Sequence, residues 1–417
     1  MQTKSRIDII ATFLFICIAT LGISCVYSAT SEFGVFSLFE GRSGKQMMFL
    51  GIAIFIGLVF FLLNSNFFEL FSWPIYGAIM LLLVAVLFVG SDINGARSWI
   101  KIGSFSLQPS EFAKYGTAFA VSALLSTIGF SFSKKADIVK LLLVILLPMG
   151  LIILQGDTGS ALVFASFILV FYREGLSPLL LVLGISIIAI FVLTLMYGSL
   201  IFSVAMIVLL GVVFAFTYTN KKILLPSIII AVLTILLSLS VQFLFDNVLQ
   251  EHQKKRIQVT LNLIEDNQGA GYNVNQSKIA IGSGGWSGKG FLNGSHTKGN
   301  FIPEQTTDFI FCTIGEEGGW LLSSGAILLF VLLILRLYHM ANRAKKKYKR
   351  VFIFSLASIL FFHLTINVGM TIGIMPVIGI PLPFISYGGS SILSFTVFMF
   401  TALKMDASRD EDLTSEY

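Results

Sequence analysis

Long apolar runs recur along this 417-residue chain, with short polar connections between most of them. A helix needs about 20 predominantly apolar residues to cross the hydrocarbon core of a bilayer. By this criterion we predict an all-α, polytopic integral membrane protein with about twelve transmembrane helices. The predicted spans lie near residues 7–28, 47–64, 72–90, 110–128, 139–155, 158–172, 178–197, 201–218, 223–245, 309–335, 351–373 and 385–404.

The polar break at Gln155–Gly159 decides the topology, because 139–172 forms either two spans or one broken helix. The two choices give opposite orientations to everything after the break. Cytoplasmic loops are enriched in Lys and Arg, and the run Arg336–Arg350 holds seven of them and no acid. With two spans and a cytoplasmic N-terminus, four basic groups face the cytoplasm: Lys134/Lys135, Arg173, Lys221/Lys222 and Arg336–Arg350. We therefore predict two spans here and both termini in the cytoplasm.

Composition agrees with a bilayer environment and removes several function classes. The chain is 56% hydrophobic and 12% charged, whereas soluble domains carry about 25% charged residues. The net charge of +6 is modest, and we predict no nucleic-acid partner. Cys17, Cys25 and Cys312 lie in or beside apolar segments, without metal or disulfide spacing. The scattered histidines argue against a histidine metal site.

This topology places three polar segments outside the membrane, at residues 91–109, 246–307 and 375–390. The second is much longer than an ordinary connection, and loops of that size are usually functional or disordered. Its mixture of apolar residues, glycines and charges suits short helices on the bilayer surface, and we expect one around 253–264.

The first polar cluster joins Gly95–Lys101 to the helix start at Gln108–Lys114. Glu111 falls in the first turn, where the helix dipole favours an acid. Lys114 follows three residues later, so the two side chains share a helix face and can form an ion pair.

Arg97 and Lys101 in the same cluster allow two interpretations. Both can anchor the protein at lipid phosphates, with Trp99 at headgroup depth. Alternatively, Arg97 forms a bidentate contact with the pyrophosphate of a substrate.

The second cluster is Gln155-Gly-Asp157-Thr-Gly-Ser160, between two short apolar segments. An acid near hydrocarbon is costly and marks a candidate functional site. The alternative is a polar hairpin at the water interface, and the residue types leave both open.

The third cluster surrounds Asp308, where the long outer loop enters an apolar helix. A partly desolvated carboxylate there is suited to act as a general base. The alternative is that Thr306, Thr307 or Asp308 simply caps the helix. Capping does not account for Glu304 or for the Glu316/Glu317 pair, which needs a cation, water or a metal ion nearby.

A glycine-dense stretch, residues 281–290, precedes the third cluster. It lacks Walker spacing and a preceding strand, which excludes a nucleotide-binding loop. The outer loop also carries candidate phosphate contacts: Lys254, Lys255, Arg256, Lys278, Lys289 and Lys298. Acids nearly balance them, so a solvated surface is the alternative for most.

The run Asn367–Ser390, with Pro376, Pro381, Pro383 and Ser386-Tyr-Gly-Gly, resembles the signature of the SEDS family, which includes RodA and FtsW. The segments 95–99, 108–114, 155–159 and 303–311 match in the same order. The resemblance covers nearly the whole chain. It implies a peptidoglycan glycosyltransferase that uses lipid II and works with a class B penicillin-binding protein. The wording at 286–291 and 303–305 is more similar to RodA, which implies a role in the elongation complex.

The resemblance also implies roles for particular residues. Asp308 matches the essential aspartate of the family and is the expected general base. Substrate-binding candidates are Arg97, Lys101, Glu111, Lys114, Asp157, Glu304, Lys289 and Ser386. A divalent cation, Mg²⁺ or Mn²⁺, is a possible cofactor. The rival function is a transporter that flips lipid II, although the polar motifs gather on one side of the membrane.

The family's usual ten spans include one span where residues 178–245 of this chain contain three. We therefore expect one SEDS-type domain over 1–417 with an extra-helix insertion at 178–245. The outer loop is expected at 246–308 and a cytoplasmic tail at 405–417.

Overall fold

The computed structural model describes residues 7–30, 41–93, 96–103, 105–217, 221–247, 254, 258 and 270–409. The chain forms two compact units. Unit 1 comprises Met1–Gly175 and Asn273–Tyr417, and unit 2 comprises Leu176–Tyr272. The helix predicted around 253–264 lies outside the described residues, except for Lys254 and Gln258.

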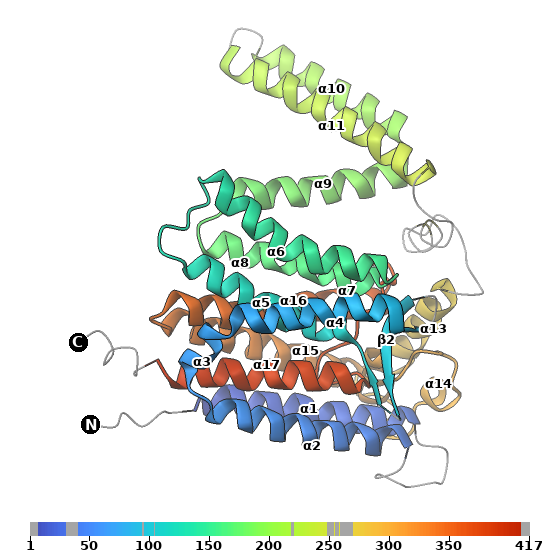
Figure 1. The fold of residues 1–417 in the computed structure, drawn as a ribbon. Helices are drawn as coiled ribbons and strands as arrows, with labels where there is room; N and C mark the ends of the chain where they lie inside the picture. Colours follow the sequence, from blue (N-terminus) through green and yellow to red (C-terminus); the bar gives the residue numbers. More distant parts are fainter. Residues whose placement is uncertain are drawn as a thin grey trace. The chain divides into compact units, whose positions relative to one another are not determined.

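Unit 1 is a bundle of long helices (Figure 1). Its helices are α1 (Ile9–Thr30), α2 (Gly41–Leu62), α3 (Ser65–Leu70), α4 (Ser72–Val89), α5 (Pro109–Ser126), α6 (Lys135–Leu154), α7 (Thr158–Leu162), η1 (Val163–Ser166), α8 (Phe167–Arg173), α14 (Ser295–Lys298), α15 (Ile310–Arg343), α16 (Lys347–Thr371) and α17 (Gly389–Ala407). Most of α13 (Ala270–Ser283) also belongs to it. α5 begins at Pro109, as predicted, and packs against α4, α6, α16 and α17.

Within the described chain, seven helices are long and apolar enough to cross a membrane: α1, α2, α4, α6, α11, α15 and α16. An eighth span results if the bent pair α9 and α10 counts as one. The other predicted spans are also helical, as α5, α17 and the shorter apolar segment Thr158–Arg173. α5 and α17 are mostly buried by other helices, so they need little lipid-facing apolar surface and tolerate small polar residues.

The reversal between α6 and α7 confirms the predicted break within 139–172. α6 ends at Leu154, Gly156 takes a positive φ of 82°, and Asp157 caps α7. The chain then returns through α7, η1 and α8 until Arg173, whose guanidinium donates to Asn342 near the end of α15. The two apolar segments are therefore antiparallel.

A kink divides α15, which the sequence predicted as one continuous span. Gly319 has φ 62° and ψ −160°, outside the helical region. Only glycine adopts such a conformation without strain. Glu316 and Glu317 consequently belong to a short helical segment that precedes the long apolar one.

A small antiparallel sheet was not expected from the sequence. β1 (Ser91–Ile93) pairs with β2 (Ala96–Ile102), which pairs with β3 (Phe105–Leu107). The sheet connects α4 to α5, so it places Arg97 and Lys101 at the same end of the bundle as the start of α5.

Unit 2 contains α9 (Pro178–Tyr197), α10 (Ser199–Thr217) and α11 (Lys221–Asn247). These are the three helices predicted in 178–245. α9 and α10 are bent by 119° at the break between them, where Gly198 has a positive φ of 82°. The Thr194 hydroxyl donates to Ser238 over 2.9 Å and joins α9 to α11.

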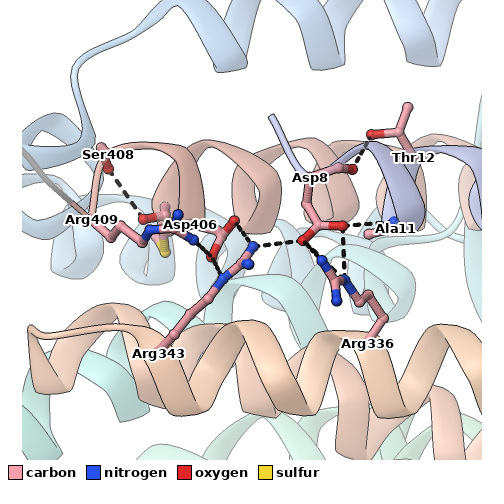
Figure 2. Close-up of polar contacts among 9 residues, drawn as sticks. Asp8, Ala11, Thr12, Arg336, Arg343, Asp406, Ser408 and Arg409 are labelled. Atoms are coloured by element: carbon pink, nitrogen blue, oxygen red, sulfur yellow. Dashed lines mark hydrogen bonds and ion pairs between the residues drawn. The ribbon is translucent and has the colours of Figure 1, made fainter. Parts of the chain in front are cut away.

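A group of charged side chains closes one end of unit 1; we call it the Asp8 clamp. It consists of Asp8, Arg336, Arg343, Asp406 and Arg409 (Figure 2). Arg343 bridges the two carboxylates, so the start of α1 and the end of α17 meet at the late turns of α15.

Candidate functional site

The turn that carries Asp308 lies against the loop between α16 and α17. The Ser386 hydroxyl donates to the Thr307 carbonyl over 2.7 Å, and the Tyr387 N–H donates to the Thr306 carbonyl over 2.8 Å. The Ser386 oxygen in turn accepts from the Leu382 N–H at 2.8 Å. Two segments separated by about eighty residues are thus joined at the candidate base.

Asn367, on α16, connects the same two segments from inside the bundle. Its fully buried amide donates to the Asp308 carbonyl over 2.8 Å and to the Ile380 carbonyl over 2.7 Å. Gly379 lies beside the carboxylate, because a Cβ at this glycine would come within 3.2 Å of Asp308 Oδ2. Its φ of +76° also disfavours other residues. We call Thr306, Thr307, Asp308, Asn367, Gly379, Ile380, Ser386 and Tyr387 the Asp308 cluster.

Helix α15 begins at Ile310, and its N-cap position is Phe309. Thr306, Thr307 and Asp308 therefore do not occupy the N-cap position of this helix. The Asp308 side chain is partly buried, which is the environment that the general-base interpretation requires. Glu304 lies in the same turn and accepts from the Thr307 hydroxyl over 2.8 Å.

The second predicted cluster lies next to this site. A Cβ at Gly159 would come within 2.5 Å of the Ile378 carbonyl, so the start of α7 touches the loop that carries Gly379. Asp157 caps α7 by accepting from the Ser160 N–H at 3.0 Å. Its other oxygen accepts from Gln108 at 2.9 Å. Asp157 therefore caps α7 at the α6–α7 reversal, beside the loop that carries Gly379, and its role in substrate binding stays a prediction.

Arg97 and Lys101 are exposed on β2. The Arg97 N–H donates to the Gln155 carbonyl over 2.8 Å, which attaches the sheet to the α6–α7 reversal. The sheet thus presents two solvated cations beside the segments that surround Asp308.

Glu111 and Lys114 form the predicted ion pair, with 2.8 Å between Lys114 Nζ and Glu111 Oε1. Both are almost fully buried, at 2% and 1% exposure. Lys114 also contacts His363 Nε2 at 3.2 Å, and His363 Nδ1 contacts the Pro381 carbonyl at 2.8 Å. The pair therefore faces the protein interior and reaches the Asp308 cluster through His363.

Glu316 and Glu317 hold the outer loop against α15. Glu316 pairs with Lys289 at 2.7 Å and accepts from the His296 and Thr297 N–H groups at 2.8 Å. Glu317 accepts from the Ser28 hydroxyl on α1. The prediction that these acids meet a cation is confirmed for Glu316, and Lys289 is engaged in that ion pair.

The other predicted cations of the outer loop lie in different environments. Lys278 lies on α13 beside Gly373, 3.2 Å from a Cβ at that position. Burial lowers the pKa of Lys298, and the charge of Glu317 offsets part of this effect. Lys255 and Arg256 lie outside the described residues.

Three residues of the site were missed by sequence reasoning: Arg42, His363 and Asn367. Arg42, at the start of α2, donates to the Thr306 hydroxyl over 2.8 Å and lies 5.9 Å from the Tyr387 ring centroid. A signal existed for His363 and Asn367, because a polar residue within an apolar span is costly unless it has a partner. Arg42 follows a polar connection and gave no such signal.

Metal binding has little support from the donor set. Among the described residues, no group of three or more His, Cys, Asp or Glu side chains lies close enough to hold a metal ion. The divalent cation therefore stays a prediction.

Comparisons with known proteins agree over nearly the whole chain. The peptidoglycan glycosyltransferase MrdB of Escherichia coli (strain K12) is 30% identical over 389 residues, covering 93% of this chain and 90% of that protein. The peptidoglycan glycosyltransferase RodA of Treponema pallidum (strain Nichols) is 30% identical over 434 residues, covering 96% and 97%. A solved structure concerned with the coordination of polymerization and crosslinking by a peptidoglycan synthase complex is 27% identical, with TM-score 0.70 and coverage of 97% and 98%.

The family model described as "Cell cycle protein", for FtsW, RodA and SpoVE, matches residues 8–204 and 198–411. These ranges include the Asp308 turn, the Asn367–Ser390 segment and both antiparallel segments at 139–172. The SEDS resemblance is thereby confirmed, and the chain belongs to the FtsW/RodA/SpoVE family of multi-pass membrane proteins.

Proposed function

We propose that this protein is a peptidoglycan glycosyltransferase that polymerises lipid II during cell elongation and cell-shape maintenance. Relatives named for this activity match more than nine-tenths of the chain. The structural observation that carries the proposal is the fixation of the Asp308 turn by Asn367, Ser386 and Tyr387. A general base must be held at a defined position before proton transfer is efficient.

In the proposed reaction, Asp308 accepts the proton of an acceptor sugar hydroxyl as its oxygen attacks the anomeric carbon of the donor. The bond from that carbon to undecaprenyl pyrophosphate breaks, and the pyrophosphate leaves with the electron pair. Attack from the face opposite the leaving group inverts the anomeric configuration. General-base assistance of this kind contributes about 10²–10⁴-fold in rate.

The leaving pyrophosphate gains negative charge, which cations stabilise. Arg97 and Lys101 are exposed and suited to this role. Arg42 is also exposed and lies beside Thr306 in the Asp308 turn. Lys114, by contrast, is buried between Glu111 and His363. We therefore assign the phosphate contacts to the exposed cations and leave Lys114 an indirect role.

We further propose that the protein lies in the bacterial cytoplasmic membrane, with both termini inside and Asp308 facing outward. The basic run Arg336–Arg350 supports this orientation. The Asp8 clamp is consistent with it, because it puts the start of α1 and the end of α17 on one side. The synthase complex in the comparison supports a penicillin-binding protein as the partner, and we propose the class B type.

The test is polymerisation of purified lipid II by the full chain in detergent, with and without the class B penicillin-binding protein. Wild type is compared with Asp308→Asn and with Asp92→Asn, a matched control at an exposed aspartate on β1. Long glycan strands from wild type and Asp92→Asn, but not from Asp308→Asn, are the expected result.

Two outcomes would change the proposal. Full activity of Asp308→Asn removes the general-base assignment but keeps the enzyme. If wild type makes no polymer under any condition, while labelled lipid II crosses liposomes that contain it, the protein is a transporter instead.

A further inference from the structure

Two side chains of α16 contact successive carbonyls of the loop that supports Asp308. His363 and Asn367 are four residues apart, so they lie on one face of the helix. His363 contacts the Pro381 carbonyl at 2.8 Å, and Asn367 donates to the Ile380 carbonyl at 2.7 Å. The second amide hydrogen of Asn367 reaches the Asp308 carbonyl. One face of α16 therefore binds both the Asp308 carbonyl and the loop carbonyls of Ile380 and Pro381.

Lys114 determines which nitrogen of His363 carries the proton. A lysine ammonium only donates hydrogen bonds, so His363 Nε2, at 3.2 Å from Lys114 Nζ, acts as an acceptor. The proton of the neutral ring then resides on Nδ1, where it is donated to Pro381. The other tautomer would direct an N–H at an ammonium group and leave the Pro381 carbonyl without this donor.

The Glu111–Lys114 pair stands at the start of this chain of contacts. Both side chains are almost fully buried, and His363 is fully buried. Glu111 Oε1 accepts from Lys114 at 2.8 Å, and Ser394 on α17 donates to the Glu111 carbonyl at 2.8 Å. The pair is thus fixed between α5, α16 and α17, away from solvent.

We propose that His363 and Asn367 are positioning residues for Asp308, and that Glu111 and Lys114 act through His363 rather than by touching substrate. The proposal rests on the glycosyltransferase function proposed above. Displacement of a reacting group by about 1 Å can cost about 10²-fold in rate. Loss of the His363–Pro381 contact is therefore expected to lower kcat about 10- to 100-fold, with little change in the KM for lipid II.

Three substitutions of His363 separate its two contacts. His363→Asn places an amide N–H where Nδ1 was, which keeps the bond to Pro381 but not the contact with Lys114. His363→Gln places an amide oxygen near the position of Nε2, which keeps a partner for Lys114 but loses the donor to Pro381. His363→Leu removes both. Thr365→Ala is the matched control on α16, because Thr365 is exposed and bonds only to its own helix.

The expected result is a low kcat for His363→Gln and His363→Leu, with His363→Asn and Thr365→Ala close to wild type. Asn367→Asp should fall with the first group, because a carboxylate cannot donate to the carbonyls of Asp308 and Ile380. Wild-type kcat in His363→Gln, or a loss confined to KM, would overturn the proposal. So would a well-folded His363→Asn that is as inactive as His363→Leu.

A second measurement reads the position of the proton in the wild-type protein. Nitrogen-15 NMR of the full chain labelled at histidine reports which ring nitrogen is protonated, and the His363→Asn spectrum assigns the signal. Protonation at Nδ1 supports the proposal, and protonation at Nε2 overturns it. The NMR result does not depend on activity. Failure of the wild-type protein to make polymer would refute the proposed function, whereas protonation at Nε2 would refute only the positioning proposal.

Discussion

The Asp308 cluster and the Asp8 clamp lie at opposite ends of α1, which is 22 residues and therefore roughly 30 Å long. At one end, Gln305 donates to the Ala29 carbonyl near the end of α1. At the other, Asp8 immediately precedes α1 and meets Arg336 and Arg343 of α15. Both ends contain buried or partly buried acids, but different groups form the bonds that hold each end together.

In the Asp8 clamp the carboxylates themselves are the bonded groups. Both oxygens of Asp8 accept from Arg336, and one also accepts from the Ala11 N–H at 2.9 Å (Figure 2). Such an acid has no capacity left for chemistry, and it closes the helix bundle. In the Asp308 cluster, Asn367, Ser386 and Tyr387 bind the main chain of the turn. These bonds hold the Asp308 turn at a defined place through its main chain, whereas in the Asp8 clamp the carboxylate–arginine bonds hold the elements together.

The largest expected effect is a loss of enzymatic activity that only the Asp308 end should show. Asp308→Asn should lower turnover about 10²–10⁴-fold, while the midpoint of thermal unfolding stays near that of wild type, because the bonds that fix the turn go to its main chain. Lipid II polymerisation and thermal unfolding in the same detergent provide the comparison. A large fall in the unfolding midpoint would make Asp308 a structural acid like Asp8.

The next effect is on stability at the other end. Asp406→Asn should destabilise the fold by about 3 kcal/mol, the lower end for breaking a buried ion pair, because Arg343 keeps 25% exposure. The measurement is thermal unfolding, with Glu69→Gln as the control. Glu69 lies 3.9 Å from Lys346 and is 45% exposed, so its loss should cost about 0.5 kcal/mol or less. Equal effects of the two substitutions would contradict the clamp.

The Asp8 clamp should also set an acid limit on stability. Burial alone would raise the pKa of Asp8, but the hydrogen bonds and charge of Arg336, with Arg343, hold it below the ordinary value of 3.8. The stabilisation is fully present above the unfolded pKa of about 3.9 and is lost as pH falls through the folded pKa.

Thermal unfolding between pH 3 and 7 tests this limit by comparing wild type with Asp8→Asn. The variant should be less stable at neutral pH and should lose less of its stability on acidification. Parallel pH profiles for the two proteins would show that Asp8 is not the group responsible.

The smallest expected effect concerns Tyr387 in the Asp308 cluster. Burial raises the pKa of its hydroxyl, and the charge of Arg42 offsets part of this. The contribution of the neutral Tyr387 hydroxyl to the free energy of unfolding is present below the unfolded pKa of about 10 and is lost as pH rises through the folded pKa. Tyr387→Phe should change neutral stability by about 0.5 kcal/mol or less and reduce the alkaline loss. An unchanged alkaline limb in thermal unfolding would contradict this assignment.

Much of the fold was predictable because hydrophobic length is a local property of the sequence. All twelve predicted spans are helical in the described chain. The break at 155–159 was predicted correctly from charge, since merging the two segments would have moved Lys221/Lys222 and the run Arg336–Arg350 away from the cytoplasmic side. The sheet at 91–107 was not predicted, because two of its three strands are only three residues long. The kink at Gly319 was not predicted, because it depends on close contact with the main chain of residues 285–288.

The candidate site was predictable only in part, and for the same reason. Asp308 and the Glu111–Lys114 pair followed from the resemblance and from helix spacing. The contact of Asp157 with Gln108 and the ion pair of Lys289 with Glu316 join residues that are 49 and 27 positions apart. A local sequence pattern cannot predict partners that are so far apart along the chain.

By itself, the sequence determined that the chain spans a membrane, where its helices lie, and which acids are too costly to lack a partner. The tertiary structure decided which partner each acid found. Asp8 and Asp406 pair with arginines, whereas the backbone of the Asp308 turn accepts a hydrogen bond from Asn367. The physical reason is that the cost of burying a charge is local, whereas its compensation comes from whichever donors the fold brings close.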